Sequence, residues 1–342
     1  MYLRKDQFMQ KKIYDDSCIV VTGAAGMIGS AVVKHLNDRG HTNLLLVDDI
    51  GTSDKWKNLI GKQFSRLIGI QDLFSFIEGK EREIEAFIHL GACSDTLEKD
   101  GSYLLENNYR YSIRLAEYAL AHNHRFIYAS SAATYGDGKE GFTDDHSSLL
   151  NLRPLNLYGF SKHLFDLWVE KQGALDKLVG LKYFNVFGPN ENHKQRMASM
   201  VFKMVPLIEQ EGVLRLFKSS APASFKDGEQ CRDFIYVKDA ARLTCEFLQN
   251  DLVGIFNVGS GKTTSWNVLA SYVFEAMDAL QNIEYIAMPE DLQKQYQNFT
   301  CADMSKLEKA RALLGLSPLC QFSMKEAVFD YVREYLLKDR RW

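Results

Sequence analysis

A glycine-rich turn between an apolar strand-like segment and a helix-like segment limits the fold of this chain more than any other feature. Residues 18–22 (CIVVT) are apolar and rich in β-branched side chains, as expected for a buried parallel strand. Gly23, Gly26 and Gly29 follow at once, and residues 30–39 have the apolar periodicity of a helix. Strand, glycine-rich turn and helix in this order predict an α/β fold with a Rossmann-type, doubly wound parallel sheet.

Each glycine of this turn has a separate expected role in binding a dinucleotide. Gly23 permits the tight turn, Gly26 lets a pyrophosphate approach the helix N-terminus, and Gly29 lets helix and strand pack closely. Met27 and Ile28 lie in the same turn and are expected cofactor contacts. A glycine-rich turn without a ligand is the alternative, which the next strand disfavours.

That next strand ends in acidic residues where a carboxylate would meet the adenosine ribose. Residues 43–47 are largely apolar, and Asp48 follows about twenty residues after the glycines. Asp48 and Asp49 should repel a 2′-phosphate and favour NAD, whereas Lys55 could offset their charge and favour NADP. The residues alone leave this choice open.

A strand predicted for residues 86–90 leads into small residues that would let a cofactor lie close to the sheet. The expected contacts are Leu90, Gly91, Ala92, Cys93 and Ser94. Cys93 has no evident catalytic partner, so we predict a thiol that lines the site rather than a nucleophile. His89 is expected to be a packed strand residue. Asn107, in a helix predicted for residues 102–122, could bond the cofactor, cap a backbone group or face solvent.

Tyr158 and Lys162, one helical turn apart, are the candidate proton-transfer pair. An ammonium about 4 Å away favours a phenolate by up to ~4 kcal/mol, which would lower a tyrosine pKa by about three units. The pattern alone is weak, because about one such pair is expected by chance. A second copy, Tyr135 and Lys139, runs through glycines and is predicted to be a turn.

Ser131 supports the choice of Tyr158 independently of that spacing. It follows a strand predicted for residues 126–130, and the carboxyl ends of parallel strands face the site in this fold. A hydroxyl there can donate to a substrate oxygen while the tyrosine takes its proton. We therefore predict a redox site built from Ser131, Tyr158 and Lys162, with Lys162 also able to bond the nicotinamide ribose.

Composition and charge disfavour several other classes of protein. The net charge is −3 without a basic stripe, which argues against nucleic-acid binding. No window approaches the ~20 apolar residues of a membrane span. The six cysteines are scattered without a C-x-x-C pair, as in a reduced cytoplasmic enzyme without a zinc site. Residues 1–16 lack the apolar core of a signal peptide and are interpreted as an extension.

Two structural units are expected after this extension. Residues 17–185, ending in a strand at 181–185, should form the cofactor-binding Rossmann domain. Residues 186–342 should form a smaller mixed α/β substrate domain, with segments near 232–262 returning to the first. The string 259–264 (GSGKTT) resembles a P-loop, but Phe256 replaces the required first glycine, so we predict a turn after a strand.

Several strings make the chain resemble extended short-chain dehydrogenase/reductases that act on nucleotide sugars, and within them the ADP-glyceromanno-heptose 6-epimerase family. The most specific are 91–94 (GACS), 128–136 (YASSAATYG), 183–189 (YFNVFGP) and 193–194 (HK). The G-x-x-G-x-x-G spacing of the first turn is also typical of the extended enzymes.

The resemblance implies an epimerase that keeps its nicotinamide cofactor, NADP with NAD as the alternative, and oxidises its sugar transiently at C6″. Its substrate would be an ADP-heptose for lipopolysaccharide core synthesis, and the family suggests a homopentamer. Two bases are implied, Tyr158 and Lys194, because one cannot easily serve both orientations of the sugar. On the residues alone, Lys194 is an ordinary loop lysine. Val186 and Lys194 complete the implied cofactor contacts.

The resemblance also implies nucleotide-sugar contacts, most of them in the second half of the chain. They are Ser131, Asn185, Arg196, Lys203, Phe217, Lys218, Ser219, Ser220, Arg232 and Tyr296. An arginine suits a diphosphate because its guanidinium binds two oxygens at once. From the residues alone, an ion pair of Arg232 with Asp233 or Glu229 is equally expected. Lys203 departs from the family, where a histidine is usual.

Other activities fit this pattern less well. A 4,6-dehydratase would need an acid pair directly after Ser131, where the chain has Ala132 and Ala133. A UDP-hexose 4-epimerase is disfavoured by the string at 193–194. A cofactor-binding regulator without chemistry would not need to keep the serine, tyrosine and lysine of the predicted redox site.

Overall fold

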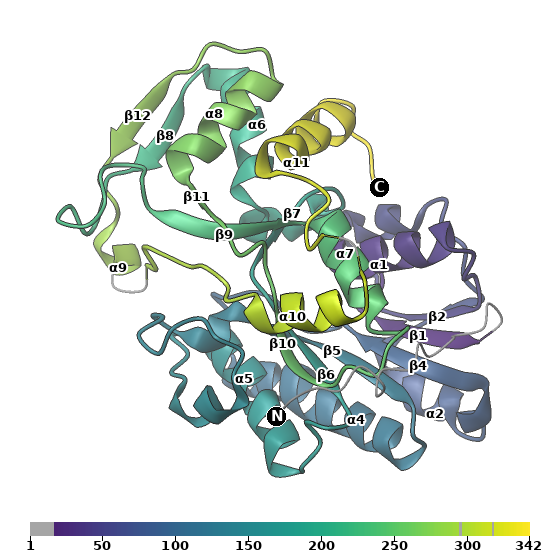
Figure 1. The fold of residues 1–342 in the computed structure, drawn as a ribbon. Coiled ribbons are helices and arrows are strands. Elements are labelled where there is room, and N and C mark those ends of the chain that lie inside the picture. The colour runs from purple at the N-terminus through teal and green to yellow at the C-terminus, as the bar shows by residue number, and fades with distance from the viewer. Residues whose placement is uncertain (1–16, 294–295, 317) are drawn as a thin grey trace.

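The computed structural model describes residues 17–293, 296–316 and 318–342. The extension predicted for residues 1–16 lies outside the described residues. Within them, parallel strands form a seven-stranded sheet in the order β10-β6-β5-β4-β1-β2-β3 (Figure 1). These strands are β1 (Cys18–Thr22), β2 (Leu44–Val47), β3 (Arg66–Ile68), β4 (Ile84–His89), β5 (Arg125–Ser131), β6 (Val179–Tyr183) and β10 (Gly254–Val258).

The order of the strands reverses at β1. The chain runs outward from β1 through β2 to β3 and then resumes at β4, on the other side of β1. Helices cover both faces of the sheet, so the predicted Rossmann-type, doubly wound fold is confirmed (Figure 1). The helices of this part are α1 (Met27–Asp38), α2 (Leu73–Ile77), α3 (Gly101–Leu104), α4 (Tyr111–Ala121), α5 (Leu157–Lys171) and α7 (Val237–Glu246). Folds of this kind bind ligands beyond the carboxyl ends of the strands at the point of reversal.

The apolar sequence of β1 follows from burial on both faces. Ile19 and Val21 belong to a core cluster that includes residues of α1 and α7. Val20 points the other way, into a cluster with residues of α4 and α5. All three side chains are fully buried, and a central parallel strand therefore needs a continuous apolar run rather than an alternating one.

The second half of the chain forms the predicted smaller mixed α/β region, green to yellow in Figure 1. A three-stranded sheet contains β7 (Asn185–Phe187), β9 (Cys231–Tyr236) and β11 (Thr263–Ser265), and β8 (Leu214–Phe217) pairs with β12 (Ile283–Ile286). The helices here are α6 (Met200–Glu211), α8 (Trp266–Ala276), α9 (Glu290–Gln293), α10 (Ser305–Leu313) and α11 (Met324–Asp330). Between these elements the chain returns to the main sheet, where α7 packs on α1 and β10 pairs with β6.

Some predicted elements differ from the observed ones near the site. The helix predicted from residue 30 begins at Met27, so the second half of the glycine turn is already helical. The helix predicted for residues 102–122 is divided by a π-helical segment, Leu105–Arg110. The strand predicted at 181–185 ends at Tyr183, and Asn185 begins β7 in the smaller sheet instead.

The P-loop-like string forms the predicted turn after β10. Both oxygens of the buried Asp233 carboxylate accept hydrogen bonds from this turn, from the backbone N–H groups of Ser260 (2.7 Å) and Gly261 (3.0 Å). The turn is therefore organised by an internal carboxylate.

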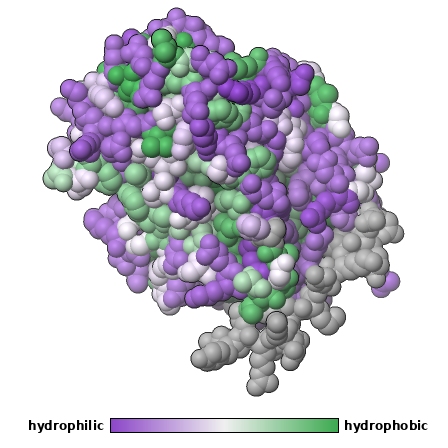
Figure 2. All heavy atoms as spheres, turned by 45° about the horizontal axis from the view of Figure 1, so that its top comes forward, coloured by the Kyte–Doolittle hydropathy of each residue, from purple (hydrophilic) through white to green (hydrophobic). Residues whose placement is uncertain are grey.

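The face of the molecule in Figure 2 is mainly hydrophilic, with smaller groups of apolar residues between the polar ones. Among the residues that the structure describes, no helix combines the length and the apolar character needed to cross a membrane.

Candidate active site

The glycine turn after β1 is tightly packed at two of its three glycines. Gly23 has a positive φ of 65°, and a Cβ there would lie 2.7 Å from the Cα of Gly91. A Cβ at Gly29 would lie 2.1 Å from the carbonyl oxygen of Gly23. The roles predicted for Gly23 in the turn and for Gly29 in close packing are confirmed by these contacts. Gly26 is the N-cap of α1 and offers no side-chain cap to the helix. The first N–H groups of α1 therefore remain for another acceptor.

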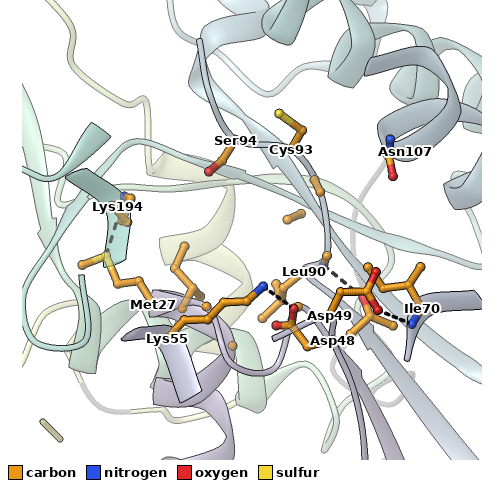
Figure 3. Close-up of a pocket in the computed structure, with 18 of the residues that line it drawn as sticks. Met27, Asp48, Asp49, Lys55, Ile70, Leu90, Cys93, Ser94, Asn107 and Lys194 are labelled. Carbon is orange, nitrogen blue, oxygen red and sulfur yellow. Dashed lines mark hydrogen bonds and ion pairs between the residues drawn. The ribbon is translucent and has the colours of Figure 1, made fainter. Parts of the chain in front are cut away.

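A cavity of about 550 Å³ lies beside this turn at the carboxyl edge of the sheet (Figure 3). Its size suits a nucleotide cofactor. Its walls contain every predicted cofactor contact except Lys162, namely Gly23, Gly26, Met27, Ile28, Gly29, Asp48, Asp49, Lys55, Leu90, Gly91, Ala92, Cys93, Ser94, Asn107, Val186 and Lys194. The walls also contain Thr22, Ile70, Tyr103, Tyr111, Ala129 and His193, which sequence reasoning did not select. Of these, only His193 carried a signal, as the neighbour of Lys194.

Asp48 is tied to the glycine turn as well as to a lysine. Its carboxylate accepts a hydrogen bond from the Ala25 backbone N–H at 2.8 Å and pairs with the Lys55 ammonium at 2.7 Å. Asp49 is exposed and accepts a bond from the Ile70 N–H at 3.0 Å. In Figure 3, Asp49 and Ile70 lie on the side of the cavity away from Lys194. At this end of the cavity the Asp48 carboxylate is therefore paired with a lysine, whereas Asp49 has no ion pair with any residue that the structure describes.

His89 and Cys93, at the end of β4, have structural roles as predicted. His89 is buried between the hydroxyls of Thr22 (2.7 Å) and Ser112 (2.9 Å), and burial lowers its pKa to about 3, so it is neutral. Burial raises the pKa of the Cys93 thiol, which disfavours the nucleophilic thiolate. The Asn108 side chain accepts a hydrogen bond from the Cys93 N–H at 2.8 Å and donates one to the Cys93 carbonyl at 2.9 Å. Asn107 lines the cavity and donates to the Tyr103 carbonyl.

Tyr158 is brought to the end of β5 by the first turn of α5. Asn156 caps this helix by accepting a bond from the Gly159 N–H at 2.8 Å. A Cβ at Gly159 would lie 2.7 Å from the Ala133 carbonyl oxygen, so the glycine permits the close approach of helix and strand end. Tyr158 and Ser131 line the same cavity, so the two residues converge as predicted.

The predicted lowering of the Tyr158 pKa by Lys162 is wrong for this structure. Burial raises the pKa of Tyr158, and the Ser131 side chain only partly opposes this. Lys162 donates instead to the Ala129 carbonyl at 2.8 Å. Burial lowers the pKa of Lys162 to about 8, against the opposing effect of the Asp166 carboxylate. The spacing of the two residues is helical, but the ammonium is directed to the backbone of β5.

The other tyrosine–lysine pair does not form a site. Gly136 and Gly138 have positive φ angles of 65° and 77°, which confirms the predicted turn. The Tyr135 hydroxyl donates to Asn257 at 2.6 Å, and Lys139 is exposed beside Asp137. Tyr135 is therefore a structural residue.

A buried ion pair lies behind the Ser131–Tyr158–Lys162 group and was not predicted. Asp166 and Lys182 are 2.8 Å apart with fully buried side chains. Asp166 also accepts bonds from the hydroxyls of Tyr128 (3.0 Å) and Ser130 (2.7 Å), and Lys182 donates to Thr134 at 2.6 Å. Both charges are thus compensated inside the core.

A second cavity, of about 370 Å³, adjoins the first. Ser131, Tyr158, Lys162 and Asn185 are among its lining residues. The two cavities share Ile28, Leu90, Ala92, Ser94, Ala129, Val186 and Lys194. Lys194 thus lies where a ligand in one cavity would meet a ligand in the other. Its ammonium is 3.9 Å from the Met27 sulfur, and a dashed line marks this contact in Figure 3.

The structure places only some of the predicted substrate contacts at or beside the second cavity. Only Ser131 and Asn185 line the second cavity. Arg232 lies over the rings of Tyr296 (5.0 Å) and Trp266 (5.8 Å), and Trp266 belongs to the cavity wall. Asp233 bonds the 259–262 turn, so the structure favours ring stacking for Arg232 over the ion pair.

The remaining predicted contacts lie outside both sets of lining residues. Arg196 is exposed and pairs with Asp95, and Lys203 donates to the Arg196 carbonyl at 2.6 Å. Phe217 is the last residue of β8, and Lys218, Ser219 and Ser220 follow it in a loop. In this loop the Ser219 N–H donates to Asp227 at 2.8 Å and the Ser220 hydroxyl donates to Asn298 at 3.1 Å. Their substrate roles stay predictions.

Comparisons with known proteins agree with this geometry. Residues 19–259 match the family model described as the NAD dependent epimerase/dehydratase family. Proteins named ADP-L-glycero-D-manno-heptose-6-epimerase are similar over nearly the whole chain. The one from Nitratidesulfovibrio vulgaris strain DP4 is 48% identical, over 93% of this chain and 97% of its own. The one from Fusobacterium nucleatum is 44% identical, over 94% and 98%. The crystal structure of the Helicobacter pylori protein of the same name is similar with a TM-score of 0.75 and 27% identity, over 94% and 96%.

Proposed function

This chain belongs to the NAD dependent epimerase/dehydratase family, and we propose that it interconverts the D-glycero and L-glycero forms of ADP-manno-heptose at C6″. It is an isomerase of nucleotide sugars, and its product would supply heptose for the lipopolysaccharide core. The observation that carries the proposal is the junction of the two cavities. Tyr158 with Ser131 lies on the wall of the second cavity, and Lys194 lines both.

The first cavity fits a nicotinamide dinucleotide. The glycine turn that lines it has no room for a Cβ at Gly23 or Gly29. Helix α1 begins beside the cavity without a side-chain cap. Gly26 and the first N–H groups of α1 would hold the pyrophosphate, and Asp48 would lie near the adenosine ribose. When bound, the cofactor would supply the hydride acceptor and donor that transient oxidation at C6″ requires.

Epimerisation through a ketone requires proton transfer on two orientations of the same sugar. The Lys194 amine would take the proton from the C6″ hydroxyl of one epimer, and the Tyr158 phenol would give its proton to the oxygen of the other. Ser131 would hydrogen-bond the same oxygen, and Lys162 would hold the ribose from the Ala129 side. One group cannot face both orientations, so the placement of Tyr158 and Lys194 supports a two-base mechanism.

Replacing Lys194 with Met should reduce turnover at least ~100-fold while the cofactor stays bound, because one of the two proton transfers loses its base. The assay incubates the protein with ADP-D-glycero-D-manno-heptose and follows the C6″ centre by NMR. Lys139→Met, an exposed lysine beside Asp137, is the matched control and should keep full activity. Near-normal turnover in Lys194→Met would contradict the two-base mechanism, and no epimerisation by the unaltered protein would contradict the proposed function.

We propose that the resident cofactor is NADP, with Lys55 as the cation that favours its 2′-phosphate. Lys55 lines the first cavity and is held by Asp48, whereas the exposed Asp49 carboxylate opposes a phosphate there. Two unit charges about 4 Å apart interact by ~1 kcal/mol in water and by ~4 kcal/mol at an effective dielectric of ~20. Removing the Lys55 charge should therefore lower the NADP/NAD ratio about tenfold or more.

Mass spectrometry of the cofactor released on denaturation measures this ratio. Lys55→Met should raise the share of NAD, and Asp49→Asn should raise the share of NADP. Lys57→Met, an exposed lysine paired with Asp54, is the control and should leave the ratio unchanged. Retention of the NADP share in Lys55→Met would remove Lys55 from cofactor selection.

We also propose a cytoplasmic homo-oligomer, with a pentamer as the arrangement suggested by the family resemblance. The free state of all six cysteines supports a reducing setting.

A further inference from the structure

Lys194 is held in a short and irregular segment. Residues Asn192–Met197 form 3₁₀-type turns with an interruption at Gln195, whose φ is 47° and ψ −119°. A side chain other than glycine rarely adopts such a conformation, so the surrounding structure must hold it. The position of Lys194 at the junction of the two cavities therefore depends on contacts made by its neighbours.

Glu191 joins the two ends of this segment. Its side chain is completely buried, and one carboxylate oxygen accepts a bond from the Ser199 backbone N–H at 2.6 Å. The other oxygen accepts from the Ser199 hydroxyl at 2.6 Å and from the Tyr331 hydroxyl at 2.9 Å. The Glu191 carbonyl accepts from the Lys194 N–H at 2.9 Å. Glu191 thus links the residues on either side of the Lys194 segment, and its bond to Tyr331 connects them to the π-helical segment Tyr331–Leu336.

The chemistry of Glu191 differs from that of the other buried charges of the site. Asp166 is compensated by a buried ammonium, whereas the donors that bond the Glu191 side chain within the described residues are an amide and two hydroxyls. Hydrogen bonds from neutral donors are directional, so they specify where both ends of the segment lie.

We propose that Glu191 is a positioning residue that places the Lys194 ammonium at the junction of the two cavities. The inference rests on the proposed function in one respect, the use of Lys194 as a base. The geometric part is that the Glu191 carboxylate, bonded to Ser199 and Tyr331, fixes the segment that carries Lys194. This part is tested separately.

The test combines turnover with a direct probe of Lys194. Lysine amines of the cofactor-loaded protein are ¹³C-methylated, and the NMR signal that is missing in Lys194→Met identifies Lys194. Glu191→Gln replaces one acceptor oxygen by an amide NH₂, which cannot accept from Ser199. We expect the Lys194 signal to shift or broaden and turnover to fall ~10- to 100-fold, with KM and cofactor content within about twofold.

Asp239→Asn is the matched control. Asp239 is similarly buried and accepts bonds from the backbone N–H groups of Gln321 (2.8 Å) and Phe322 (3.3 Å), away from both cavities. It differs from Glu191 in also pairing with Arg242 at 3.3 Å. It should lower thermal stability without changing the Lys194 signal. If Glu191→Gln does not fold, Tyr331→Phe removes one donor, keeps the carboxylate and should move the same signal by a smaller amount.

An unchanged Lys194 signal in both Glu191→Gln and Tyr331→Phe would overturn the inference. A displaced Lys194 signal with normal turnover would support the positioning by Glu191 and would contradict the catalytic role of Lys194. The two failures are therefore distinguishable.

Discussion

Replacing Tyr158 with Phe is expected to lower turnover about 10²- to 10⁴-fold while the nicotinamide cofactor remains bound. The phenol oxygen is the group that would exchange a proton with the sugar, and Phe keeps the ring but not this oxygen. Tyr158 contributes no lining to the first cavity, so cofactor content should not change. Turnover by NMR at C6″ and the mass of the released cofactor measure the two quantities.

The second tyrosine–lysine pair of the chain provides a control for this variant. Tyr135→Phe also removes one buried hydroxyl four residues before a lysine, but this hydroxyl donates to Asn257 and not to the site. It should keep most of its turnover and lose about 1–3 kcal/mol of unfolding free energy, because the Asn257 acceptor is left without its donor. Equal losses of turnover in Tyr135→Phe and Tyr158→Phe would show that the effect is structural.

Replacing Asp166 with Asn is expected to cost about 3–5 kcal/mol of unfolding free energy, because it leaves the Lys182 ammonium buried without its carboxylate. The pair is fully buried, so water cannot replace the lost partner. Denaturant unfolding followed by circular dichroism gives the free energy.

The double variant Asp166→Asn with Lys182→Met tests this explanation. It removes both charges and keeps their approximate volume, so it should be more stable than Asp166→Asn alone. Asp278→Asn, which breaks an exposed pair with Arg333, should cost at most about 1 kcal/mol. A double variant no more stable than Asp166→Asn would mean that the loss of stability comes from the bonds that Tyr128 and Ser130 donate to Asp166, rather than from the unpaired charge on Lys182.

The cofactor cavity was largely predictable because its signals are local. The glycine turn, Asp48 and residues 90–94 each follow a strand, and the doubly wound topology brings the carboxyl ends of those strands together. The turn at Gly136 and Gly138 was predicted for a similar reason, since the glycines mark a local backbone conformation.

The details of the proton-transfer group were less predictable. Helical spacing placed Tyr158 and Lys162 on one face, but the direction of the ammonium depends on the Ala129 carbonyl, which lies in a different element. The raised pKa of Tyr158 comes from burial, which results from packing of the whole site rather than from spacing along the chain. The substrate contacts at Arg196, Lys203 and 217–220 rested on resemblance and have no counterpart among the cavity walls.

The amino-acid sequence by itself determined the fold class, the dinucleotide turn and the identity of Ser131, Tyr158 and Lys162 as a group. These depend on the order of residues within a strand, a turn or a helix. The tertiary structure alone decided that Asp166 pairs with Lys182, that Glu191 reaches Ser199 and Tyr331, and that Lys194 stands between the two cavities. Such contacts join segments far apart in the chain, and their energies depend on burial, which no local pattern of residues records.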